Sequence, residues 1–212
     1  MEHNPIDQIA DRIRQSFDTR TAARDLALAQ TRLLTRHCAN AIRAIHRDEN
    51  HPAEEHLAAA QALISKLKID LADFPDLFYA GYTQDALKEF AEARLVFALV
   101  NHQELPQPED LGVEPSTYMQ GLAEAAGELR RRCLDKLRQG DSEEAVHLLT
   151  MMDDIYTELI TMDYPDAVTG GLRRLTDIAR SILERTRGDL TISLRQEQLE
   201  TMLRRMEERL AG

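Results

Sequence analysis

The feature that most constrains this chain is a long stretch near its start that lacks helix-breaking residues. Between Pro5 and Pro52 there is no Gly or Pro. Apolar residues spaced three or four apart predict an amphipathic helix, here about 40 residues and about 60 Å long, with a possible bend near 18–21. A helix of that length cannot bury its whole apolar face within a small monomer, so we expect assembly. The recurring apolar residues are Ile6, Ile9, Ile13, Phe17, Leu26, Leu33, Ile42 and Ile45.

Pro and Gly residues divide the rest of the chain into further helices. Gly140 ends one of them, and Asp141-Ser142-Glu143-Glu144 resembles a capping box that starts the next. No segment has the alternation of a strand. We therefore predict an all-α fold, a single domain over 1–212 built as an antiparallel bundle of about six to seven helices, with a long first and a long last helix. After the first helix, we expect helices from Pro52, over about 76–101, 116–138, 142–162 and 172–210, and a loop over 102–115.

Composition supports a folded helical protein and excludes several other classes. Hydrophobic residues make up 43% of the chain and charged residues 30%, with no Trp. Cys38 and Cys133 both fall inside helical patterns, so we expect no disulfide and a reducing, cytoplasmic location. The first fifteen residues lack the apolar core of a signal peptide. The longest apolar run, Ala93–Val100, is interrupted by Arg94 and is too short to span a membrane.

The charge balance limits how this chain can bind nucleic acid. Its formal net charge is −11 and its pI is about 5.1, so an evenly basic surface is excluded and any RNA site must be a local basic patch. Arginine suits phosphate because its guanidinium donates two parallel hydrogen bonds. Each residue can equally be a solvated or ion-paired part of a helix surface. The candidates are Arg32, Arg36, Arg43, His46 and Arg47 on the first helix, and Arg173, Arg174, Arg180, Arg185 and Arg187 on the last.

Two pairs of carboxylates are candidates for chemistry. Glu89 and Glu92 are three residues apart, and Glu124 and Glu128 are four apart, so each pair shares a helix face. Carboxylates from two facing helices would make a pocket of the hard oxygen ligands that Mg²⁺ prefers. A divalent cation held there can activate water and stabilise the charge on a phosphate. The structural alternative is that these glutamates are solvated or paired, as Glu128 could be with Arg131.

Four segments resemble the translin / translin-associated factor X family. Leu87-Lys88-Glu89-Phe90-Ala91-Glu92-Ala93 looks like the family's Q-E-[FY]-[VI]-E-A element. The stretch 118–130, Tyr-Met-Gln-Gly-Leu-Ala-Glu-Ala-Ala-Gly-Glu-Leu-Arg, looks like D-Y-L-x-G-x-x-D-L-T-G-E-L-x-R. The stretch 164–189 is similar to prokaryotic members, and Ile45-His46-Arg47 resembles the end of their first helix. The order and spacing of these elements along most of the chain carry the resemblance.

This resemblance implies an all-α fold of about seven helices that assembles into a hollow homo-octamer. In the catalytic branch it implies an endoribonuclease that uses Mg²⁺ (or Mn²⁺) to cleave single-stranded RNA, with single-stranded RNA or DNA as the partner. The residues that match the metal-binding positions are Glu89, Glu92 and Glu124, with Glu128 as a further catalytic carboxylate. The family's Asp is replaced here by Glu124, which is longer by one methylene.

Three other functions stay open at this stage. The first is a non-catalytic, translin-like protein that binds single-stranded nucleic acid. The second is a di-metal carboxylate four-helix protein, which would need Glu-x-x-His motifs; the predicted fourth helix has Glu124 and Glu128 in a Glu-x-x-x-Glu arrangement instead. The third is a helical scaffold with no site.

Overall fold

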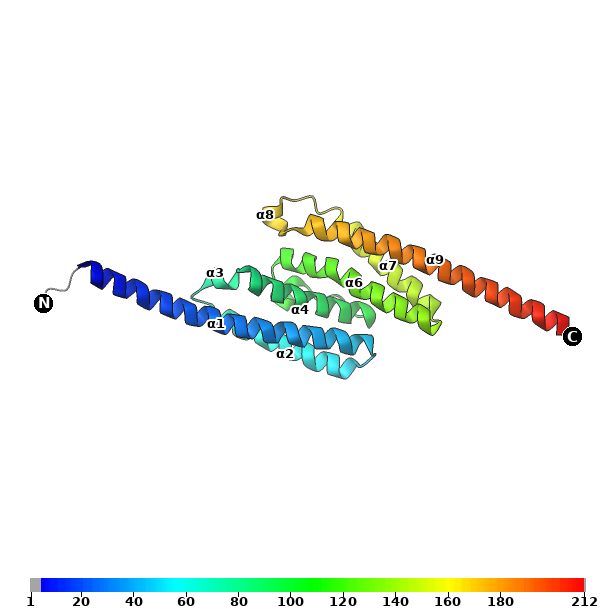
Figure 1. Cartoon of the computed structure of the whole chain (residues 1–212), viewed down its shortest axis with the longest axis horizontal. Coiled ribbons are helices and arrows are strands. Elements are labelled where there is room, and N and C mark those ends of the chain that lie inside the picture. The colour runs from blue at the N-terminus through cyan, green and yellow to red at the C-terminus, as the bar shows by residue number, and fades with distance from the viewer. Residues whose placement is uncertain (1–4, 212) are drawn as a thin grey trace. The chain divides into compact units, whose positions relative to one another are not determined.

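A computed structural model describes residues 5–211, and every regular element in that range is a helix (Figure 1). Three of these helices, α3, α5 and α8, have four residues each, and the other six have 18 or more. The predicted all-α fold is confirmed. The helices are α1 (Pro5–His46), α2 (Asn50–Asp70), α3 (Pro75–Phe78), α4 (Gly81–Val100), α5 (Pro108–Leu111), α6 (Pro115–Gln139), α7 (Ser142–Leu159), α8 (Asp166–Thr169) and α9 (Leu172–Ala211).

The chain forms two compact units. One takes in the residues up to Ala93 together with Gln107–Val113, and the other takes in Arg94–Pro106 and the residues from Glu114 on. Helix α4 begins in the first unit and ends in the second. The organisation as one domain over 1–212 stays a prediction.

In the first unit, α1 runs without interruption for 42 residues and packs along α2. Leu34 and Ile45 of α1 and Leu57 and Ile64 of α2 are almost completely buried and belong to the apolar faces of the two helices. The apolar stripe predicted for the first helix is only partly correct, because Ile42 and Ile45 are buried. The other predicted members are exposed in the described chain: Ile6, Ile9, Ile13, Phe17, Leu26 and Leu33. Helix α1 ends where Asp48 takes a left-handed conformation, with φ 59°.

The third predicted helix, over about 76–101, is wrong in one respect, because the chain forms two helices there. Pro75 begins α3, and the backbone turns before α4 starts at Gly81. The buried hydroxyl of Thr83 donates a hydrogen bond of 2.8 Å to the carbonyl of Leu77. This bond satisfies one of the carbonyls that the end of α3 leaves free, and so stabilises the break.

In the second unit, α6, α7 and α9 pack around one apolar cluster that includes Leu129, Leu148 and Leu183. Gly140 ends α6 with φ 80°, a conformation that favours glycine. The carboxylate of Asp141 accepts a hydrogen bond of 3.3 Å from the backbone N–H of Glu144 and so caps α7. Both boundaries agree with the sequence prediction.

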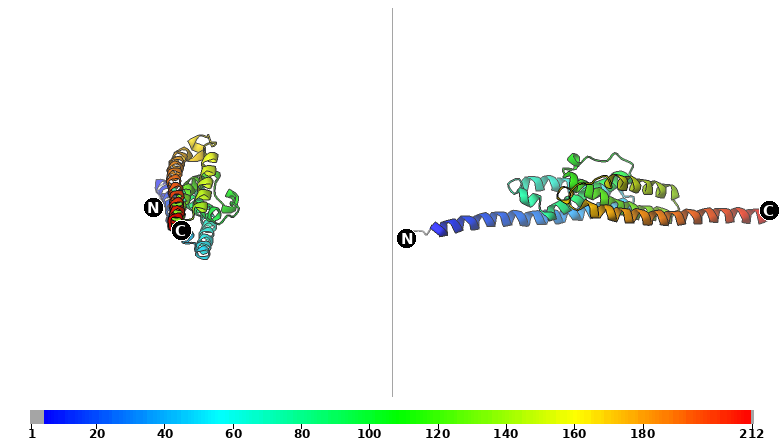
Figure 2. Two further views of the ribbon diagram at one scale, coloured as in Figure 1. Left: turned by 90° about the vertical axis from the view of Figure 1, so that its right-hand side faces the viewer. Right: turned by 90° about the horizontal axis from the view of Figure 1, so that it is seen from above.

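The outer ends of the two long helices carry exposed apolar side chains. Figures 1 and 2 show that the first half of α1 extends beyond its neighbour α2, and that the last part of α9 extends beyond α6 and α7. On α1, Ile6 is 70% and Phe17 63% exposed; on α9, Met206 is 59% and Leu210 85% exposed. Among the described helices, none is long and apolar enough to cross a membrane.

Candidate functional site

Helix α4 places the first predicted carboxylate pair in apolar surroundings. Its side chains from Ala86 to Ala98 are mostly buried, and Phe90 is completely so. Glu92 is only 8% exposed and Glu89 is half-buried. The two lie one turn apart on one face of the helix, as the sequence predicted. A buried carboxylate costs free energy unless other groups compensate its charge, so the site is more than a solvated helix face.

The thiol of Cys38 shows which side of the first unit these carboxylates face. The pKa of this α1 cysteine is raised to about 12, first because the thiol is buried and then because Glu89 and Glu92 place negative charge near it. A nearby negative charge disfavours a thiolate. The carboxylate pair therefore faces α1.

Helix α6 carries the second pair. Glu124 is half-buried between the buried residues Ala123 and Ala125. Glu128, one turn further on, is also half-buried and lies 3.7 Å from Arg131. The predicted ion pair of Glu128 is thus present, and it makes Glu128 a weaker candidate for a metal ligand than Glu124.

A shallow groove between α1 and α4 in the first unit brings an acidic and a basic candidate together. It has a volume of about 460 Å³, and Arg32 and Glu89 both line it. Tyr82 also lines the groove, and its buried hydroxyl has no hydrogen-bond partner among the described residues. Tyr82 was not predicted as a site residue, because nothing in the sequence places it opposite α1.

The arginines near the end of α1 form a continuous basic stripe. Arg32, Arg36, Arg43 and Arg47 are all exposed. The first three lie within about 40° of one another around the helix and along about 16 Å of its length, and Arg47 directly follows the last residue of α1. None of the four has a carboxylate partner among the described residues. The reason is local, because no Asp or Glu occurs between Leu26 and Arg47. We call these four residues the arginine stripe.

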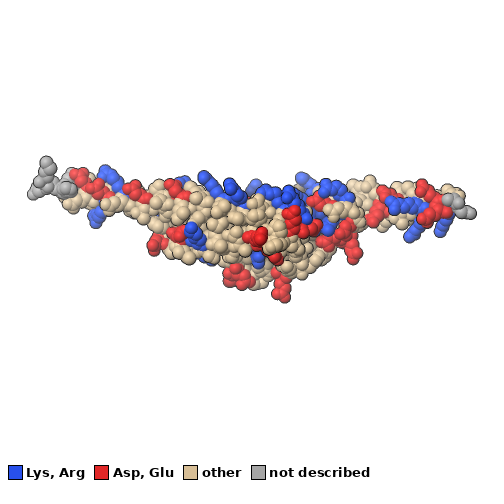
Figure 3. Space-filling model, turned by 90° about the horizontal axis from the view of Figure 1, so that it is seen from below, with Lys and Arg blue, Asp and Glu red and all other residues tan. Residues whose placement is uncertain are grey.

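His46, predicted together with these arginines, differs from them because it is half-buried. On the face drawn in Figure 3, Lys and Arg side chains gather in places among the acidic and uncharged ones. The negative net charge is therefore spread unevenly, which a local basic site requires.

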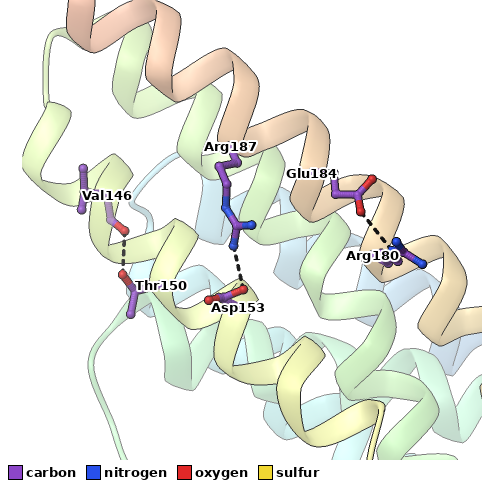
Figure 4. Close-up of polar contacts among 6 residues, drawn as sticks. All are labelled: Val146, Thr150, Asp153, Arg180, Glu184 and Arg187. Carbon is purple, nitrogen blue, oxygen red and sulfur yellow. Dashed lines mark hydrogen bonds and ion pairs between the residues drawn. The ribbon is translucent and has the colours of Figure 1, made fainter.

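The arginines of α9 behave differently from the arginine stripe. Arg187 lies 2.8 Å from Asp153 of α7, and Arg180 lies 2.9 Å from Glu184 on its own helix (Figure 4). Arg173 is 3.2 Å from Asp163. These three arginines are therefore ion-paired parts of the helix surface, which makes them weaker candidates for contact with phosphate.

Comparison with known proteins assigns the chain to a family. Its sequence matches the Translin family over residues 10–208, and the chain belongs to that family. An uncharacterized protein from Methanocaldococcus jannaschii is 32% identical over 188 residues, which cover 88% of this chain and 83% of that protein.

Solved structures have the same fold. The chain resembles AfC3PO in its complex with duplex RNA, with a TM-score of 0.79 and 33% identity over 87% of this chain and 95% of that one. It also resembles AfC3PO crystallised alone, with a TM-score of 0.80 and 31% identity over 87% and 96% of the two chains. NeC3PO without ligand has a TM-score of 0.80 at 18% identity, over 91% of this chain and all of that one, a likeness of fold alone.

The raised thiol pKa predicts how Cys38 reacts. At about pH 8 the native thiol should be protonated and react with iodoacetamide far more slowly than a free cysteine. Because the folded pKa lies above the unfolded one, this thiol stabilises the fold below about pH 9 and loses that contribution as pH rises toward 12. Mass spectrometry of native and urea-unfolded protein measures the two labelling rates. Comparison with Cys38→Ala measures how much of the loss of stability at alkaline pH comes from this thiol. Equal labelling rates in both states would contradict this.

Proposed function

We propose that this protein binds RNA and cleaves single-stranded RNA with the help of a divalent cation. The observation that carries the proposal is the pair of buried Glu92 and half-buried Glu89 on α4, in a chain of the Translin family whose solved relative AfC3PO forms a complex with duplex RNA. The arginine stripe supplies the phosphate contacts that a chain with a net charge of −11 otherwise lacks.

Glu89, Glu92 and Glu124 are the residues proposed to hold the cation. Ala123 and Ala126 of α6 lie on either side of Glu124 and Ala125 in the sequence. Both belong to the same apolar cluster as Leu95, which is one turn beyond Glu92 on α4. The donor set consists of carboxylate oxygens, which suits Mg²⁺ or Mn²⁺. When bound, such a cation would offset the negative charge that builds up on the phosphate during hydrolysis.

The residues of the chain itself bind and orient the RNA. The guanidinium groups of the arginine stripe donate hydrogen bonds to successive phosphates along α1. Arg32 lies at the groove that Glu89 also lines, so it would hold a phosphate next to the acidic residues. In the same groove, the ring of Tyr82 offers a face for a base to stack on.

A protein that binds RNA without cleaving it is the second candidate. It is favoured by the arginine stripe, which needs no metal, and by Glu124, whose side chain is longer than the Asp of the family element. The two functions share the binding surface and differ only in the acidic residues, so they are separable by mutation.

We further propose that copies of this chain assemble into a homo-oligomer, with the octamer as the expected state. The exposed apolar residues on the first half of α1 and the last part of α9 support it, because monomeric proteins rarely expose apolar stripes of this length. A second copy is the occupant proposed for them.

Cleavage should depend on the buried carboxylates. With a fluorescent single-stranded RNA and Mg²⁺, we expect Glu92→Gln to lower the rate by at least about 100-fold, and EDTA to abolish cleavage. The matched control is Glu54→Gln, which changes an exposed glutamate on α2. Unchanged cleavage by Glu92→Gln and by Glu124→Gln would contradict the site, and tight RNA binding without cleavage under any divalent cation would favour the second candidate.

Binding should depend on the arginine stripe. The double variant Arg36→Gln, Arg43→Gln should weaken single-stranded RNA binding at least about 10-fold at low salt and reduce the slope of log K against log salt by about 1.4, because two phosphate contacts are lost. Fluorescence anisotropy across a salt series measures both quantities. Arg24→Gln is the control, since Arg24 is exposed on the same helix but lies 3.3 Å from Asp25. An equal loss in the control would show a general charge effect instead of a stripe.

Assembly should depend on the apolar residues of α1. Light scattering of the wild type should give a mass near eight times the 24.1 kDa chain, and Ile13→Asp with Phe17→Asp should lower that mass while circular dichroism keeps its helical signal. Arg14→Ala, on the same exposed segment, should leave the mass unchanged. A wild-type mass of 24.1 kDa would overturn this proposal.

A further inference from the structure

A second group of histidine and carboxylate side chains lies in the second unit, separate from the carboxylates of α4. Two histidines and three carboxylates line one surface hollow with a volume of about 430 Å³, and no other residue lines it. These residues are His102, Asp141, Glu143, Glu144 and His147. Neither the family assignment nor the proposed RNA chemistry uses any of them.

The end of α4 fixes the position of His102. This residue follows the last turn of the helix in a left-handed conformation, with φ 52°. Its N–H donates to the carbonyl of Leu99 at 3.3 Å, and the N–H of Gln103 donates to the carbonyl of Ala98 at 2.9 Å. This pair of bonds is a Schellman motif, which sets the direction in which the backbone leaves the helix. The backbone that carries the imidazole of His102 is therefore an ordered turn.

The start of α7 supplies the facing side chains. Glu144 and His147 are three residues apart in the first two turns of α7 and so share one face of that helix. The Nε2 atom of His102 lies 3.9 Å from Oε2 of Glu144. The rings of His102 and His147 lie with their centroids 5.0 Å apart at an interplanar angle of 40°. Two imidazoles and one carboxylate thus converge from two helix ends.

We propose that His102, Glu144 and His147 bind a divalent transition-metal ion of the zinc class. Two imidazoles and a carboxylate are ligands that suit Zn²⁺, Co²⁺ and Ni²⁺, whereas Mg²⁺ takes oxygen ligands. Coordination at about 2.0–2.2 Å brings the three side chains closer than they now lie. That movement is available because the side chain of His102 is 57% exposed and His147 is also exposed.

The surrounding charges favour a cation over an anion. The N-terminus of α7 carries a partial positive charge, equivalent to about half an elementary charge, but three carboxylates line the hollow beside it. Asp141 is already engaged, because it caps Glu144 and lies 3.7 Å from Lys136. This leaves Glu144 as the carboxylate ligand, with Glu143 beside it. A bound ion would join the end of α4 to the start of α7.

A plain His–Glu ion pair is the competing explanation for the contact between His102 and Glu144. It requires no metal and gives His147 no role. Metal binding makes the opposite prediction, because removal of the second imidazole would weaken it as much as removal of the first. The two explanations therefore differ in the effect of one substitution.

The test is titration of the full-length protein, first stripped with EDTA, with Co²⁺ and then Zn²⁺. We expect one tightly bound ion per chain, a visible absorption band from Co²⁺ that Zn²⁺ displaces, and a higher melting temperature with Zn²⁺. His102→Gln and His147→Gln should each weaken binding at least about 10-fold and remove the melting shift.

The matched control is His51→Gln. His51 is an exposed histidine that lies 3.6 Å from Glu55 but has no second imidazole beside it in the structure, so its loss should leave binding unchanged. Circular dichroism establishes that each variant is folded. Equal Zn²⁺ affinity in wild type, His102→Gln and His147→Gln would overturn the proposal, as would binding lost only in Glu92→Gln. RNA cleavage tests the proposed role of the α4 carboxylates, whereas Zn²⁺ titration tests the proposed site at His102, Glu144 and His147. Failure of one proposal can therefore be distinguished from failure of the other.

Discussion

The burial of α4 is the constraint on which the rest of the structure depends. This helix contributes apolar side chains such as Phe90 and Leu95 to the interior, and it carries Glu92 into the same surroundings at 8% exposure. An ionised carboxylate in such a place must have its charge compensated. The raised pKa of Cys38 shows that the effect of this charge reaches α1. An apolar residue at this position would suit a helical scaffold better, and Glu92 is one of the residues proposed to hold the divalent cation.

Segregation of charge would allow so acidic a chain to contact RNA as proposed. On the first half of α1 and on α9, arginines such as Arg14 and Arg187 have a carboxylate within reach. Between Leu26 and Arg47 there is none, so the arginine stripe is left for an external partner. Net charge controls long-range attraction, but contact with phosphate depends on the few residues that touch it. A net charge of −11 therefore argues against general affinity for polyanions and leaves room for one local site.

Most of the fold could be predicted from the sequence, because helix ends are marked by local chemistry. Gly140 and Asp141 placed the boundary between α6 and α7 correctly. The break before α4 was missed because it depends on a hydrogen bond from Thr83 to a carbonyl six residues away. The spacing of Glu89 and Glu92 was predictable, whereas Tyr82 in the groove and the approach of His102 to α7 depend on tertiary packing. The lack of carboxylate partners for the arginine stripe could have been predicted, because the sequence has no Asp or Glu over 26–47. The net charge of the whole chain did not reveal this local feature.

The central claim is that carboxylates of α4 and α6 share one divalent cation. Fe²⁺ substituted for Mg²⁺, with ascorbate and hydrogen peroxide, generates hydroxyl radicals that cut the backbone next to the bound ion. Mass spectrometry of the fragments should find cuts around Glu89 and Glu92 on α4 and around Glu124 on α6, and excess Mg²⁺ should suppress both sets together. Cuts confined to the surroundings of His102 and His147, or none on α4, would contradict the claim.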